Sequence, residues 1–183
     1  RADVKVPVFQ RLYRVPSYAE AQPGEAEALD TFAQLLGGDT TAALYRELVV
    51  KRKIAIDAGA SYDGFNRDDG TFGIYAVPRP GVSLAAVEKA ADAVLAHYLA
   101  NAPAADELNR AKTQLVASAL YRRDSQFAMA STYGQALSIG LTINDVDAWP
   151  TRIKAVTADN LRKVAARDLI LKESVTGYLR PGK

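Results

Sequence analysis

The chain has 183 residues, of which 49% are hydrophobic and 24% are charged, as in ordinary soluble globular proteins. Its 23 basic and 21 acidic residues nearly balance and are scattered, so no basic stripe indicates a nucleic acid as partner. No stretch approaches the roughly 18 consecutive apolar residues of a membrane helix, so no membrane span is expected. Cysteine is absent, which excludes disulfides, thiolate nucleophiles and cysteine-based metal sites.

The chain starts at Arg1 without an initiator methionine or a signal peptide, and a strand pattern begins within a few residues. We therefore expect a fragment of a longer chain, with any targeting signal upstream of it.

The N-terminal part predicts one strand and two helices. Residues 4–15 are rich in β-branched and aromatic types, which favours a strand. Apolar residues at helical spacing over 29–36 predict a helix, and Gly37-Gly38 is expected to stop it. Thr40 or Thr41 can then cap a second, shorter helix over 44–48.

A β-hairpin is predicted next. Apolar residues alternate over 54–60 and again over 72–76, and the glycines and aspartates between them are typical of turns. The connection from Asp63 to Gly70 is polar and longer than usual for a hairpin, so we predict that it is mobile.

The rest of the chain is helical in pattern until its last residues. A long amphipathic helix from residue 83 is broken at 101–103, and a second one follows, with Glu107, Arg110 and Gln114 expected to face outward. Shorter helical segments are predicted over 133–139 and 144–153. A last helix begins after Thr157, a good N-cap, and a strand over 174–181 closes the chain.

This order of elements predicts an α+β fold with an antiparallel or mixed sheet and helices packed on one face. Strands and helices cluster separately, and nothing in the sequence indicates a second domain. We expect residues 1–183 to form a single domain.

The sequence offers few groups for catalysis or metal binding. Catalytic zinc needs three protein ligands and an open position, whereas the single histidine is His97, beside the apolar stripe of a helix. A Ser-His-Asp arrangement would have to use this same histidine and is disfavoured. Asp68-Asp69 falls in a turn and Asp106-Glu107 in the first turn of a helix, where acidic residues complement the helix dipole. A site built from carboxylates alone stays open.

Four stretches, taken in order, resemble the C-terminal half-domain of pitrilysin/insulinase-type zinc metallopeptidases, the superfamily of the mitochondrial processing peptidases. They are LLGGDTTAALYRELVVKRKIA, ADELNRAKTQLVAS, RIKAVTADNLRKVAARDL and SVTGYLRP. In this family a Gly-Gly-x-Ser/Thr-Ser/Thr segment opens the helix that carries a Leu-Tyr-Arg-Glu-Leu phrase. The resemblance covers essentially the whole chain.

The resemblance implies one half of a clamshell that closes around a peptide. The other half would carry the zinc on an inverted motif, His-x-x-Glu-His, which is absent here. Family members lend an Arg and a Tyr seven residues later from the half that this chain resembles. Those positions are Val49 and Ile56 in this sequence, neither of which can donate a hydrogen bond to a developing oxyanion. Arg46 or Tyr62 could replace one partner, but their spacing does not fit the pair.

The expected function is therefore that of a non-catalytic lobe, completing the peptide-binding chamber of a zinc-dependent metalloendopeptidase. No catalytic, metal or cofactor-binding residue is expected in this chain, and zinc is expected in the catalytic partner lobe, in the same chain or in a partner subunit. The stretch 49–56 is expected to form a weak surface for a peptide or for the partner lobe. The resemblance to exported bacterial members favours the periplasm. The alternative is a structural or peptide-binding module in which both lobes are inactive.

Overall fold

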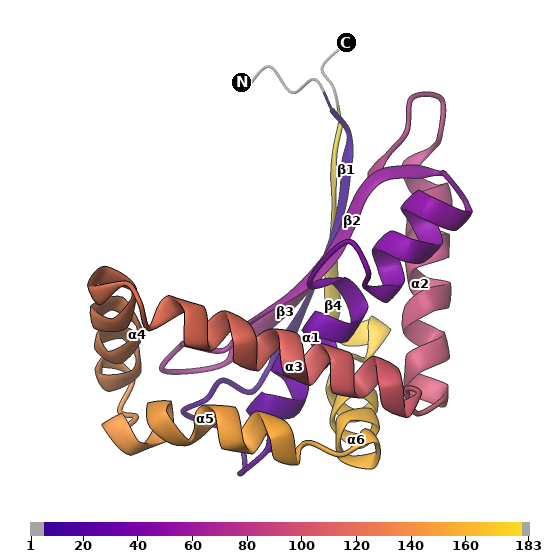
Figure 1. Ribbon diagram of the computed structural model, residues 1–183. Coiled ribbons are helices and arrows are strands. Elements are labelled where there is room, and N and C mark those ends of the chain that lie inside the picture. The colour runs from indigo at the N-terminus through magenta and orange to yellow at the C-terminus, as the bar shows by residue number, and fades with distance from the viewer. Residues whose placement is uncertain (1–5, 181–183) are drawn as a thin grey trace.

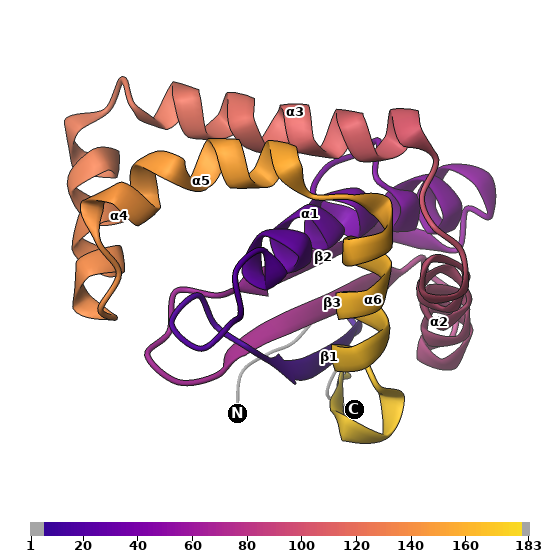
Figure 2. The same ribbon diagram turned by 90° about the horizontal axis from the view of Figure 1, so that it is seen from below.

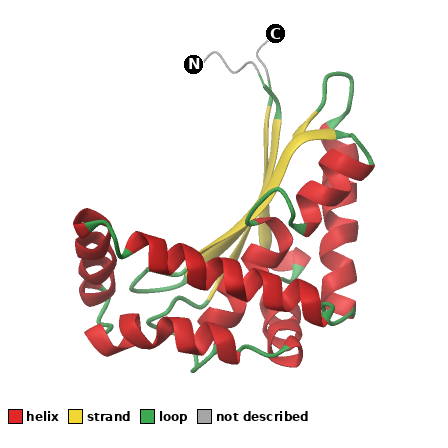
Figure 3. Cartoon of the chain, viewed as in Figure 1, coloured by secondary structure: helices red, strands yellow, loops and turns green. Residues whose placement is uncertain are grey.

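The computed structural model describes residues 6–180, and it confirms the α+β class (Figures 1 and 3). Residues 4 and 5 of the first predicted strand lie outside the described residues. The strands are β1 (Val8–Val15), β2 (Ala55–Asp63), β3 (Gly70–Pro78) and β4 (Ser174–Leu179). The α-helices are α1 (Glu25–Gly37), α2 (Leu84–Ala100), α3 (Ala105–Arg122), α4 (Gln126–Ser138), α5 (Ile143–Ala155) and α6 (Ala158–Asp168). Two further turns are a π-helix, η1 (Tyr45–Lys51), and a 3₁₀ turn, η2 (Leu171–Glu173).

The four strands form one sheet in the order β2-β3-β1-β4, and every neighbouring pair is antiparallel. The first strand is therefore central: Phe9 of β1 lies between Ala76 of β3 and Tyr178 of β4. Of the two predicted alternatives, antiparallel and mixed, the antiparallel sheet is the correct one.

Helices cover one face of this sheet and leave the other open. Along β1 the residues alternate strictly, with Phe9, Arg11, Tyr13 and Val15 buried and the residues between them exposed. On the open face Leu12 of β1 is paired with Val175 of β4, which is 72% exposed. Figure 2 shows α1 next to the sheet with α3 and α5 beyond it, so the helices form two tiers.

The core lies between the sheet and its first tier of helices. Its largest fully buried side chains are aromatic: Phe9 and Tyr13 from β1, Phe32 from α1 and Phe72 from β3. The rings of Phe32 and Phe72 are 5.8 Å apart, so α1 and β3 meet through an aromatic pair. Burying each such side chain contributes about 1.5–3 kcal/mol.

Helix α1 ends at Gly37, as predicted, but the glycine is required for another reason. Neither Gly37 nor Gly38 has the left-handed backbone of a glycine C-cap. A Cβ on Gly37 would lie 1.9 Å from the backbone nitrogen of Ala60, because the end of α1 rests directly on β2. Only a residue without a side chain fits there.

The second predicted helix forms, but as a π-helix and without a threonine cap. No side chain caps η1. Thr41 instead donates its N–H (2.6 Å) and its hydroxyl (2.7 Å) to Oδ1 of Asp39, which tightens the turn before the helix. The prediction of a cap at Thr40 or Thr41 was therefore wrong.

The caps of two later helices explain where they begin. Thr157 accepts a hydrogen bond from the N–H of Asn160 and so caps α6, as predicted. Thr142 and Asp145 form a reciprocal capping box at the start of α5. Within residues 6–180 no helix is long and apolar enough to cross a membrane. The mobility predicted for the β2–β3 connection stays a prediction.

Candidate functional site

The segment that joins η1 to β2 holds the two positions singled out by the family resemblance. Val49 is buried and belongs to the core, whereas Ile56 is 49% exposed. Val50, on the outer side of η1, is 55% exposed, and the basic residues 51–53 follow it. The segment therefore presents apolar and cationic side chains to solvent and no hydrogen-bonding pair at positions 49 and 56.

This segment is also where the backbone departs most from regular geometry. The N–H of Arg52 bonds to the carbonyl of Glu47, five residues back, which defines the π-turn. Lys53 then has φ of 54°, the left-handed region that glycine favours. Its conformation lets Ile54 donate to the carbonyl of Leu48 and close the helix. A β-bulge follows at Ile56, where the β2–β3 register shifts between Ala55 and Asp57. π-Turns and bulges concentrate at functional sites because they re-aim side chains.

The structure does not bring the two alternative residues, Arg46 and Tyr62, together. Nη2 of Arg46 pairs with Oε1 of Glu107 at 2.9 Å. The hydroxyl of Tyr62 donates to the carbonyl of Pro16 at 2.7 Å. Each side chain therefore has its own structural partner, and the two line different cavities.

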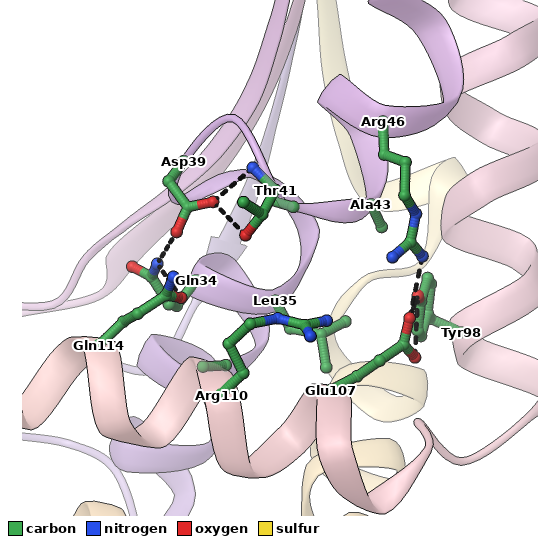
Figure 4. A pocket seen from close by; sticks show the side chains of 12 residues that line it. Gln34, Leu35, Asp39, Thr41, Ala43, Arg46, Tyr98, Glu107, Arg110 and Gln114 are labelled. Carbon is green, nitrogen blue, oxygen red and sulfur yellow. Dashed lines mark hydrogen bonds and ion pairs between the residues drawn. The ribbon is translucent and has the colours of Figure 1, made fainter. Parts of the chain in front are cut away.

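Two polar clusters lie behind η1 (Figure 4): one joins Arg46 of η1, Tyr98 of α2 and Glu107 of α3, and the other joins α1 to α3. The hydroxyl of Tyr98 donates to Glu107, the partner of Arg46. Burial acts to raise the pKa of Glu107, but the bonds from Arg46 and Tyr98 outweigh it and lower that pKa overall. Farther along α3, Gln114 accepts a hydrogen bond from Gln34 of α1 at 3.2 Å. Glu107 and Gln114 thus bind neighbouring elements, and the prediction that they face outward was wrong.

These two clusters stabilise the packing of the elements and leave no room for a ligand. The space enclosed by the residues of Figure 4 is about 20 Å³, roughly that of one water molecule. A hollow of about 320 Å³ beside it is lined by charged groups that are already paired, Arg46 with Glu107 and both Lys51 and Arg52 with Glu47.

His97 is exposed on α2 and packs edge-on against the ring of Tyr98 at 5.2 Å. Its Nδ1 lies 3.4 Å from the amide of Asn101. Within the part of the chain that is described, no three histidine, aspartate or glutamate side chains are grouped so that they could hold a metal ion. The donors present therefore do not fit a zinc site.

In the acidic pairs Asp68-Asp69 and Asp106-Glu107, each side chain whose contacts are described has a structural role. Asp69, in the β2–β3 connection, pairs with Arg14 at 3.2 Å. Asp106 is exposed in the first turn of α3, as predicted.

A cleft of about 580 Å³ lies between the tip of the β2–β3 hairpin and helices α3, α4 and α5. Asp30 of α1 lies deep in it. Oδ2 of Asp30 accepts a hydrogen bond from the hydroxyl of Tyr18. Nε1 of Trp149 donates to that hydroxyl at 2.6 Å and, in a longer second contact, to Oδ2 at 3.2 Å. Burial raises the pKa of Asp30 to about 6. No sequence motif indicates this cluster, because Tyr18 and Trp149 are 131 residues apart in the sequence.

The family model described as Peptidase M16 inactive domain matches residues 3–115 of the chain. An uncharacterized zinc protease of Streptomyces coelicolor is 30% identical over 156 residues, which are 85% of this chain and 33% of that protein. The chain thus spans about a third of the length of this curated relative.

Solved structures share the fold at low sequence identity. A protease from Helicobacter pylori aligns with a TM-score of 0.88 and 22% identity, over 99% of this chain and 42% of its own. An inactive peptidase domain from Bordetella parapertussis aligns with a TM-score of 0.86 and 18% identity, over 100% of this chain and 96% of its own. The α+β fold described above is therefore that of an inactive peptidase domain.

Proposed function

Because the chain belongs to the family of Peptidase M16 inactive domains, we propose that it is the non-catalytic lobe of a zinc-dependent metalloendopeptidase. It completes a peptide-binding chamber opposite a catalytic lobe that carries His-x-x-Glu-His and the zinc. The observation that carries this proposal is the match of the inactive-domain model over residues 3–115. The chain spans about a third of the S. coelicolor zinc protease, which leaves ample length for a catalytic lobe in a protein of that size.

The surface proposed to face the chamber is the η1–β2 segment. It combines exposed Val50 and Ile56 with three consecutive basic residues. A π-turn, a left-handed residue and a β-bulge make its backbone irregular. Surfaces between lobes that open and close are more polar than a core. A mixed apolar and cationic strip suits such a transient contact with a peptide or with the partner lobe.

Complementation tests this function. The purified chain alone should not cleave an unfolded peptide, and mixing it with its matching catalytic lobe should restore or enhance chelator-sensitive cleavage. Ile56→Glu should reduce the restored cleavage, because it places a negative charge beside the basic residues 51–53. Leu120→Glu is the matched control, since Leu120 is as exposed but lies on α3.

Two results would overturn the proposal. Chelator-sensitive cleavage by the chain alone would show that the domain is catalytic. The absence of any His-x-x-Glu-His lobe, in the same polypeptide or in a partner, would favour the structural or peptide-binding module with two inactive lobes.

We also propose that the parent protein is exported, as the resemblance to exported bacterial members implies. Separating periplasm from cytoplasm in cells that express the full-length gene tests this location, and recovery in the cytoplasm alone would contradict it.

A further inference from the structure

The cleft around Asp30 has an unused acceptor at its deep end. Both protein donors, Tyr18 and Trp149, bond to Oδ2, and no residue among 6–180 donates to Oδ1. Among the described side chains only the hydroxyl of Tyr13 is both closed off from solvent and without a partner. Oδ1 of Asp30 is therefore reached by solvent from the cleft.

The walls above this carboxylate are aromatic. The ring of Tyr18 lies 5.2 Å from the ring of Phe65 and 6.1 Å from that of Tyr62, and all three line the cleft. Helices α3 and α4 contribute apolar side chains on the opposite side, including Leu115 and Phe127. Figures 1 and 2 both place α4 at the same end of the molecule as the β2–β3 connection, and residues of both line the cleft.

We propose that this cleft binds a lysine side chain of an extended polypeptide, with its ammonium group on Oδ1 of Asp30 and its aliphatic stem along the aromatic walls. Aromatic faces attract cations, and a lysine stem packs readily against apolar surface. Oδ1 of Asp30 opens onto the cleft without a protein donor, and an ammonium group supplies both a donor and the opposite charge. The cleft volume of about 580 Å³ lies in the range of ligand sites, roughly 300–1,000 Å³.

The geometry selects lysine over arginine. Arginine binds a carboxylate best through two parallel hydrogen bonds that use both oxygens. At Asp30 one oxygen is already occupied by Tyr18 and Trp149, which leaves a single acceptor. One acceptor suits the compact point charge of a lysine ammonium group.

The other charged groups near Asp30 leave it free for a ligand. Glu27, one turn earlier on α1, is bound by Arg152 of α5 at 2.6 Å. Arg152 also lies 3.8 Å from Asp145 at the rim. Arg122 of α3 is exposed at the mouth of the cleft, and its charge lowers the pKa of Asp30 without a hydrogen bond between them. Arg122 would therefore compete with a bound lysine.

Trp149 is the only tryptophan in the chain, so its fluorescence reports directly on the cleft. The probe is a capped peptide, acetyl-Ala-Leu-Lys-Leu-Ala-amide, titrated into the purified chain. Matched peptides carry arginine, acetyl-lysine or norleucine in place of the lysine. The lysine peptide should change the fluorescence and saturate, and the three others should bind about tenfold more weakly or worse.

Variants link the signal to Asp30. In Asp30→Asn the amide oxygen can still accept from Tyr18 and Trp149, which turns the NH₂ group toward the cleft and repels an ammonium group. This variant should lose at least about tenfold in affinity for the lysine peptide while its circular dichroism stays unchanged. Asp106→Asn, exposed on α3 and outside the cleft lining, is the matched control and should bind like the unmodified chain. Arg122→Gln should bind a few-fold more tightly, because it removes the competing cation.

Equal binding of the lysine and acetyl-lysine peptides, unchanged binding by folded Asp30→Asn, or no binding at all would overturn this inference. Identifying the bound polypeptide as a peptidase substrate rests on the proposed function, but binding to the isolated chain does not. Lysine binding without complementation would contradict the proposed function alone. Complementation without lysine binding would contradict only the role of the cleft.

Discussion

Gly37 is the point at which helix α1 comes closest to the sheet, and its missing side chain is what permits that approach. Gly37→Ala should lower the free energy of unfolding by about 2–4 kcal/mol, because the new methyl group would meet the backbone of Gly59 and Ala60 and one of the elements must move. Gly38→Ala is the control: the atoms nearest to its Cβ are the side-chain amide of Gln34, which can swing aside at the cost of its hydrogen bonds, and the loss should stay near 1 kcal/mol, about that of a hydrogen bond. Urea unfolding measures both. Similar losses for the two variants would contradict the packing explanation.

Asp30 should make stability fall as the pH rises through the acidic range. Its pKa is about 6 in the folded chain against 3.8 as the ordinary value, so the folded state keeps its proton longer than the unfolded state. The resulting stabilisation is fully present below about pH 4, declines as the pH rises and is lost above about pH 6, a change of about 3 kcal/mol. The groups that face Asp30 are Tyr18, Glu27, Arg122 and Trp149.

Urea unfolding of the unmodified chain and of Asp30→Asn between pH 4 and pH 7 checks this change. Carboxylates with lowered pKa values act in the opposite direction, but they cancel in the difference between the two proteins. A difference that stays constant over this range would show that Asp30 does not titrate as inferred.

The sequence predicted the structural roles of some single residues but not of others. The lone His97 was correctly interpreted as a helix residue at the edge of an apolar stripe, because the spacing of its neighbours is local information. The glycines after Leu36 predicted a helix end, but not a contact with β2. Asp30 could not be singled out, since its partners Tyr18 and Trp149 come from a loop and from a helix more than 100 residues later.

At the scale of the elements, the strands and long helices follow from their periodicity, whereas η1 does not. The Leu-Tyr-Arg-Glu-Leu phrase is compatible with an α-helix as well as a π-helix. The π-turn forms because the N–H of Arg52 bonds to the carbonyl of Glu47 and Lys53 takes a left-handed conformation. Arginine and lysine have no intrinsic preference for these backbone conformations. Such backbone detail is set by the strand that follows and by its bulge at Ile56.

Helix α4 is the least anchored of the α-helices. Like α5 it has a single buried residue, Ala136, but α5 also packs against α1 and α3, whereas the principal contact of α4 is α5 alone. Its backbone amides should therefore exchange with deuterium faster than those of α1, most of whose residues are buried. Mass spectrometry after brief labelling resolves the two helices, and the interior of α3 serves as a second reference. Protection of α4 equal to that of α1 would show that the cleft wall is rigid.

At the scale of the whole molecule, the α+β class and the single covered face of the sheet could be predicted, but the strand order could not. The class follows from the clustering of strand and helix patterns along the chain. The order β2-β3-β1-β4 depends on pairings such as Phe9 with Tyr178, whose geometry leaves no local trace in the sequence.

The chain should hold no stoichiometric zinc. It has one histidine and no cysteine, and the described residues offer no cluster of three metal-binding side chains. Elemental analysis after dialysis against trace zinc measures the content, with the catalytic lobe as the positive control. One tightly held zinc ion per chain would contradict both this prediction and the non-catalytic assignment.

The central position of β1 has a consequence for synthesis on the ribosome. The backbone groups on one edge of β1 pair with β3. Those on the other edge stay unpaired until β4, which begins at Ser174, has been synthesised. At about 5–20 residues per second, the ribosome needs roughly 5–20 s to cover the distance from Pro78, where β3 ends, to Ser174. During that interval the nascent sheet exposes unpaired backbone groups along its middle strand, and these can recruit a strand from another chain. A ribosome that stalls before Ser174 would prolong the time for which this strand edge is unpaired. Synthesis of the last strand therefore determines when the nascent chain loses this site of aggregation.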